Sequence, residues 1–126
     1  MRFDLGSSQY SPERIDAFFR DLSTRARSIA GVDGASIINA PPFGEGVGNE
    51  SAWLATEGSA GIRDSKLMVD TVIVGPRYFS TMGIPLFAGR DFEDSDNDKS
   101  GAVALINPAG ARRLFADERS GLGQRV

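Results

Sequence analysis

An amphipathic segment near the start of the chain constrains the fold most, because its apolar face must pack against another element. Ser11, Pro12 and Glu13 are typical of a helix start, where serine caps, proline suits the first turn and glutamate complements the helix dipole. The apolar residues that follow recur at helical spacing: Ile15, Phe18, Phe19, Leu22, Ala26 and Ile29. Gly31 is predicted just past the helix end. We expect the stripe to pack on a sheet, with Phe18 or Phe19 almost fully buried.

Strand signals lie on both sides of this helix. Alternating or β-branched stretches predict strands at 2–5, Val32–Asn39, Ser51–Thr56, Leu67–Val74 and Ala102–Ile106. Within the fourth stretch, one face is expected to carry Leu67, Val69, Thr71 and Ile73. Pro41 and Pro42 end the second stretch, because proline removes a ladder donor.

Two further helices are predicted in the second half of the chain. Gly75 and Pro76 open a short one that runs through Met82 and is closed by Gly83, and Asn107 caps another that runs to about Phe115. A small apolar cluster is expected around the first, formed by Tyr78, Phe79, Met82, Leu86 and Phe92. Strands alternate with helices and no internal repeat is seen, so the fold class is α+β or α/β with a mixed sheet.

Composition excludes several classes of function. The chain has no histidine and no cysteine, which removes Ser-His-Asp and Cys-His catalysis, thiolate zinc sites and disulfides. Its net charge is −3 with no basic run, which argues against binding nucleic acid. No apolar run approaches the roughly 20 residues of a membrane span.

Two motifs resemble ligand-binding loops, but the residues at the required positions do not match the known patterns. Residues Gly44–Gly48 read G-x-G-x-G, whereas a dinucleotide loop needs G-x-G-x-x-G opening a helix, so we interpret them as a flexible loop. Asp94, Asp96 and Asp98 have the opening spacing of a calcium loop. The glycine and glutamate that such a loop requires are replaced by Lys99 and Leu105, which favours a solvated acidic turn.

The remaining candidates have structural explanations. Asp16 with Arg20, and Asp117 with Glu118, are interpreted as solvated surface charges rather than acid/base pairs. Trp53, Tyr78 and Phe79 could stack a sugar or base but are more typical of a core. We therefore predict no catalytic, cofactor-binding or metal-binding residue, and no cofactor.

A series of spaced motifs carries a family resemblance. In order along the chain these are Tyr10–Arg14, Phe18–Leu22, Ile29–Val32, Ala35–Ser36, Ala40–Pro42, Val74–Leu86, Gly89–Phe92, Ala102–Asn107, Ala111–Phe115 and Gly121–Val126. From about Tyr10 to Val126 the chain resembles the MacB-like periplasmic core domain of ABC-transporter permeases in the FtsX-like superfamily, and it looks most like the orphan-permease branch. The stretch from Tyr78 to Phe92 is the most specific part. One departure is Ala30 before Gly31, where the family usually has proline.

This resemblance implies a two-lobed α+β fold over residues 1–126. A porter-like βαβ lobe would draw on about 1–65 and a small α/β lobe on about 66–126. The family's domain continues through strands that this chain lacks, so the resemblance also implies a truncated domain. Such domains are non-enzymatic and lie on the periplasmic side of the inner membrane, between the first two transmembrane helices of the permease.

The resemblance implies partners as well. These would be the transmembrane helices of the same full-length chain, a separate cytoplasmic ATPase, a second permease subunit in a homodimer and a periplasmic accessory protein. Two other hypotheses stay open from the residues alone. One is a free-standing ligand- or peptide-binding module with Pro41–Asp64 as its mouth; the other is a hydrolase that acts through carboxylates.

Overall fold

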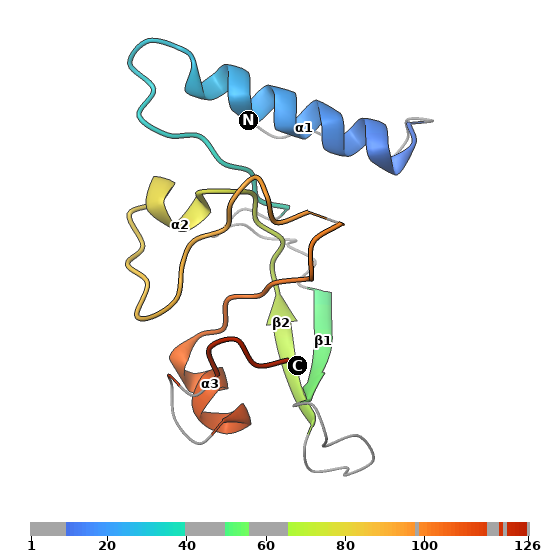
Figure 1. Cartoon of the computed structure of the whole chain (residues 1–126), viewed down its shortest axis with the longest axis vertical. Helices are drawn as coiled ribbons and strands as arrows, with labels where there is room; N and C mark the ends of the chain where they lie inside the picture. Colours follow the sequence, from blue (N-terminus) through green and yellow to red (C-terminus); the bar gives the residue numbers. More distant parts are fainter. Residues whose placement is uncertain are drawn as a thin grey trace.

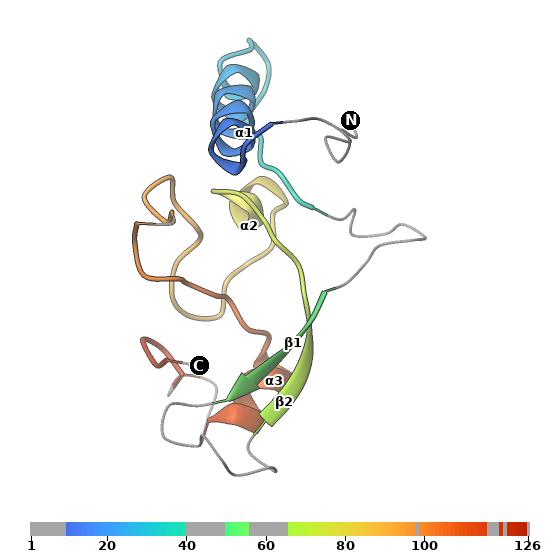
Figure 2. The ribbon, with the colours of Figure 1, turned by 90° about the vertical axis from the view of Figure 1, so that its right-hand side faces the viewer.

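The chain folds as a mixed α+β structure of three helices and one two-stranded sheet within the residues described (Figure 1). The computed structural model describes residues 10–39, 50–55, 66–97, 99–115, 119 and 121–125. The order is α1 (Pro12–Arg27), β1 (Glu50–Ala55), β2 (Lys66–Thr71), α2 (Tyr78–Thr81) and α3 (Pro108–Leu114). Two views at right angles place α1 at one end of the molecule, the sheet and α3 at the other, and α2 between them (Figures 1 and 2).

Helix α1 begins where the sequence predicts but ends at Arg27, so that Ile29 lies outside the helix and Gly31 does not directly follow its end. Ser11 is the N-cap residue and its carbonyl accepts the N–H groups of Arg14 and Ile15 at 3.0 and 3.1 Å. Asp21 and Arg25 form an ion pair at 2.8 Å one turn apart. After the helix, Gly31 adopts the left-handed conformation with a φ of 85°, which glycine reaches without a steric penalty.

The packing predicted for α1 is wrong. Phe18 is 44% exposed and Phe19 is half-buried, so neither side chain is enclosed. The buried residue of this helix is Ser23, whose hydroxyl donates to the Phe19 carbonyl at 2.8 Å. The reason is position: α1 lies beyond α2 at the far end from β1 and β2, so the sheet is out of reach of its apolar stripe (Figure 2).

The sheet is an antiparallel pair in which Leu54 lies opposite Leu67 and Trp53 opposite Met68. Leu67 is buried, and α3 packs against β2. Leu67, Val69 and Thr71 are more enclosed than their neighbours, which confirms the predicted alternation, but Ile73 lies outside β2 and is exposed. Because cross-strand partners share a face, Trp53 and Met68 together cover the opposite, exposed face.

Two predicted strands do not form. Val32–Asn39 is extended and is reduced to one bridge, Ile38 with Val74, supported by a 2.7 Å hydrogen bond from Gly75 N–H to the Ile37 carbonyl. Glycine suits position 75, because a Cβ there would lie 3.3 Å from the Ile37 nitrogen, closer than most Cβ contacts. Ala102–Ile106 belongs to no ladder. A strand needs a partner alongside it. In the described chain, Val32–Asn39 meets the stretch around Val74 at this one bridge, and Ala102–Ile106 meets no strand. The strand expected at 2–5 lies outside the described residues.

The two short helices follow their end signals. After helix α2 the chain turns at Gly83, which has a φ of 66°. Helix α3 begins at Asn107, whose side-chain oxygen accepts the Gly110 N–H at 2.7 Å, and its Ala111 is 3% exposed. Both helices therefore confirm local sequence signals.

Candidate functional site

The stretch from Gly75 to Asp96, which includes Tyr78–Phe92, folds back on itself around α2. Its entry residue, Arg77, has a φ of 60° and is the single non-glycine residue with positive φ in the described chain. That conformation is uncommon for a residue with a Cβ and persists where surrounding contacts impose it. Here the Arg77 N–H donates to the Phe92 carbonyl at 2.9 Å, and the Arg77 carbonyl accepts from Ser80 and Thr81.

Asp91 caps α2 from a distant part of the chain. One carboxylate oxygen accepts the Ser80 N–H at 2.9 Å and the other accepts the Phe92 N–H at 2.8 Å. Partial burial opposes ionisation, but these backbone hydrogen bonds outweigh it and hold the pKa of Asp91 below its usual value. The side chain thereby satisfies an N-terminal N–H of α2 that has no partner within the helix.

A second carboxylate closes the loop beyond Asp91. Asp96 accepts two hydrogen bonds from the Arg90 guanidinium, both at 2.7 Å, and a third from the Glu93 N–H at 2.8 Å. Hydrogen bonding to Arg90 lowers the pKa of Asp96 to about 2. Arg90 also donates to the backbone carbonyl of Asp91 at 3.0 Å, so this arginine joins Asp96 to the backbone at Asp91.

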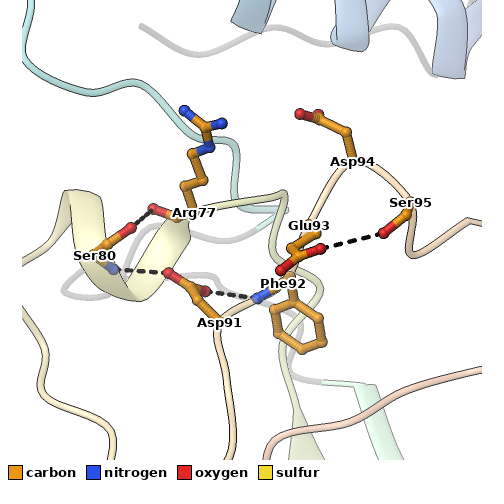
Figure 3. Close-up of a pocket in the computed structure, with 7 residues that line it drawn as sticks. All are labelled: Arg77, Ser80, Asp91, Phe92, Glu93, Asp94 and Ser95. Atoms are coloured by element: carbon orange, nitrogen blue, oxygen red, sulfur yellow. Dashed lines mark hydrogen bonds between the residues drawn. The ribbon is translucent and has the colours of Figure 1, made fainter.

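A hollow of about 550 Å³ opens beside these contacts (Figure 3). Its lining residues are Arg77, Ser80, Asp91, Phe92, Glu93, Asp94 and Ser95. Figure 3 shows the Asp91 carboxylate turned to the backbone of Ser80 and Phe92, with Arg77 and Asp94 at the rim. Asp94 lies 3.8 Å from the Arg27 guanidinium, which links the acidic loop to α1. Both carboxylate oxygens of Asp91 are thus engaged by the chain itself, whereas Glu93 and Asp94 make long contacts, to Ser95 at 3.5 Å and to Arg27 at 3.8 Å.

The aromatic part of the predicted apolar cluster is confirmed. Tyr78 is buried and meets Phe79 edge-on with ring centroids 5.4 Å apart, and Phe79 meets Phe92 at 6.3 Å. Met82 is 48% exposed and makes the cluster smaller than predicted. The core assignment is also wrong for Trp53, which is 66% exposed because it lies on the outward face of β1.

The structure describes only some of the other candidates from the sequence. In the acidic turn, Asp96 is not simply solvated, because Arg90 holds it, and its side chain is only 11% exposed. Asp98, the Gly44–Gly48 loop, and Asp117 with Glu118 lie outside the described residues. Among the residues that the structure does describe, no group of three or more acidic side chains is placed to hold a metal ion.

Sequence reasoning missed the roles of Asp91 and of the Arg90–Asp96 pair. No sequence spacing predicts either contact. The carboxylate of Asp91 caps a helix that precedes it in the chain, and Asp96 binds Arg90 across a turn. The available signal was the cluster Gly89-Arg90-Asp91-Phe92 directly before an acidic loop. Gly89 has a φ of 84°, which permits the turn that brings Arg90 into place.

Comparisons with protein-family models, with curated proteins and with solved structures give no match to this chain. Within the described part, no helix has the length and apolar character needed to cross a membrane. The structure shows a mixed α+β chain in which the hydrogen bonds of Asp91 and Asp96 connect segments of the chain itself.

Proposed function

We propose that this chain is a non-enzymatic, extracytoplasmic domain of an ABC-type permease. In this role it would couple cytoplasmic ATP hydrolysis to export or to mechanical transmission across the membrane. The proposal includes the two lobes expected from the resemblance, a porter-like βαβ lobe over about 1–65 and a small α/β lobe over about 66–126. It also includes a periplasmic location on an inner-membrane protein.

The observation that carries the proposal is how the motif from Gly75 to Asp96 uses its charges. Asp91 and Asp96 accept hydrogen bonds from backbone N–H groups and from Arg90, and so join α2 to the loop that follows it. An acid/base site needs carboxylates in contrasting environments that face a substrate. In this motif both carboxylates are stabilised in the ionised form, which supports a structural connection in preference to catalysis.

The proposed partners follow from the same family resemblance. They are the permease's own transmembrane helices, a separate cytoplasmic ATPase, a sister subunit and a periplasmic accessory protein. The alternative of a free-standing ligand- or peptide-binding module depends on Pro41–Asp64, where the structure describes only Glu50–Ala55, and no observation on β1 favours it.

The location is tested by cysteine labelling, which suits a chain without native cysteine. Lys99 is exposed, so we expect Lys99→Cys in the full-length gene product to react with a membrane-impermeant maleimide in intact spheroplasts. A cytosolic single-cysteine protein serves as the control and should react only after lysis. Labelling of Lys99→Cys only after lysis would contradict the proposal.

The flanking sequence in the gene separates the two extracytoplasmic hypotheses. A permease domain requires an apolar stretch of about 20 residues on each side, with further spans downstream. A secreted binding module requires none after its leader. Absence of a span on either side would therefore overturn the permease assignment even if the labelling succeeds.

A further inference from the structure

The outward face of the two-stranded sheet carries a methionine next to a tryptophan. Met68 of β2 lies opposite Trp53 of β1 in the antiparallel register. Such partners project from the same face of a sheet, with Cβ atoms about 5 Å apart. Met68 is 61% exposed and Trp53 is 66% exposed. The thioether of Met68 is therefore accessible to small solutes in the folded protein.

The methionine thioethers are the only sulfur atoms of this chain. The sequence has three methionines and no cysteine, whose thiolate would otherwise compete for an oxidant. The structure describes two of them, Met68 and Met82. Met82 is the C-cap residue of α2 and is 48% exposed, so it is the more enclosed of the two. A thioether has no proton to lose, and access to its sulfur therefore governs its rate of oxidation.

The position of Met68 in β2 lets the fold tolerate a polar group there. Its neighbours Leu67 and Val69 project to the other side of the sheet, where Leu67 is buried and Val69 is half-buried. A sulfoxide oxygen on the outward face is solvated by water, so no unpaired polar group is buried. The enclosed side of the sheet stays apolar, and an enzyme that reduces the sulfoxide can reach it.

We propose that Met68 is a site of reversible oxidation, at which a peroxide converts the thioether into a sulfoxide in the folded protein. The sulfur gains one oxygen atom and loses two electrons, and hydrogen peroxide is reduced to water. A methionine sulfoxide reductase reverses the step: two thiols are oxidised to a disulfide, and the oxygen leaves as water. Oxidation thus makes the face beside Trp53 polar, and reduction makes it apolar again.

Limited treatment of the 126-residue protein with hydrogen peroxide, followed by peptide mass spectrometry, tests the order of reaction. Met68 should gain an oxygen atom at least about twofold faster than Met82, which serves as the comparison within the same sample. In denaturant that unfolds the protein, the two rates should converge, because the difference depends on exposure in the fold. Circular dichroism of the oxidised protein should match that of the untreated protein.

Trp53 provides a second readout, because it is the single tryptophan of the chain and lies opposite Met68. Peroxide should change its fluorescence in wild type and in Met82→Leu, the matched control, but not in Met68→Leu. Leucine keeps an apolar side chain of similar volume in both variants. Treatment with methionine sulfoxide reductases of both epimer specificities should restore the fluorescence of the wild-type protein.

Three results would overturn the proposal. The first is oxidation of Met82 before Met68, or at an equal rate, in the folded protein. The second is a fluorescence response that Met82→Leu loses and Met68→Leu keeps. The third is a sulfoxide at Met68 that forms only after unfolding or that the reductases do not remove.

Discussion

Asp91 and Asp96 show how a single ionised side chain can order several backbone groups. The Asp91 carboxylate accepts hydrogen bonds from the backbone N–H groups of Ser80 and Phe92. The Asp96 carboxylate accepts hydrogen bonds from the Arg90 guanidinium and from the Glu93 N–H. Arg90 connects the two through the Asp91 carbonyl. Hydrogen bonds to charged groups are stronger than neutral ones, so this small network defines the conformation of a loop that has little apolar content.

The Asp96 contact predicts a dependence of stability on pH. Its pKa falls from 3.8 to about 2 in the folded protein, so the ionised form stabilises the fold. That contribution is complete above about pH 5 and is lost as the pH falls from about 4 to 2. The melting temperature of wild type should exceed that of Asp96→Asn by a constant margin above about pH 5, and the margin should disappear near pH 2.

Asp94→Asn is the matched control for this measurement. Asp94 is more exposed and lies 3.8 Å from Arg27, so its removal should change the melting temperature little at any pH. A margin for Asp96→Asn that persists unchanged at pH 2 would show that shape, and not charge, accounts for the role of Asp96.

At the scale of the element, the sequence predicts where a helix begins better than it predicts what the helix packs against. Helices α1 and α3 both start at a polar N-cap residue followed by proline, as their sequences predict, but only Asn107 accepts a cap hydrogen bond with its side chain, and Ser11 does not. Yet α1 exposes Phe18, while the short α3 encloses Ala111 against β2. Cap chemistry acts within one turn, whereas burial depends on which other element arrives.

The Asn107 cap should make a measurable contribution to stability. Asn107→Ala removes the acceptor of the Gly110 N–H and should lower the free energy of unfolding by about 1 kcal/mol, measured by urea denaturation. Asn107→Asp keeps an acceptor oxygen and should retain most of that stability. Equal losses for the two variants would indicate that the 2.7 Å contact does not stabilise the helix.

At the scale of the whole molecule, the described residues enclose few apolar side chains. The buried apolar residues are Leu67, Tyr78 and Ala111. Exposed large ones are spread over every part of the described chain, with Ile29 near α1, Trp53 on the sheet and Phe87 after α2. Apolar surface on this scale is typical of a protein whose faces meet partners.

This limited core predicts weak unfolding cooperativity for the isolated chain. The urea m-value scales with the surface exposed on unfolding and runs from about 1 to 3 kcal/mol/M for small proteins. We expect a value at or below about 1 kcal/mol/M at low protein concentration. A value of about 2 kcal/mol/M or more would show that the isolated chain buries much more apolar surface than Leu67 and Tyr78 imply.

The sequence by itself determined the features that depend on neighbours along the chain. The start of α1 at Pro12, the left-handed Gly31 and Gly83, and the Asn107 cap follow from backbone sterics and from hydrogen bonds that span only a few residues. The alternation of Leu67, Val69 and Thr71 likewise follows from the two-residue period of a strand.

Only the tertiary structure decided which segments meet. It placed α1 away from the sheet, left Ala102–Ile106 without a partner strand among the described residues, and turned Asp91 back to cap α2. These outcomes depend on contacts between residues far apart in sequence. A periodic pattern records that a face is apolar or that a backbone is extended, but it does not record what will lie against it.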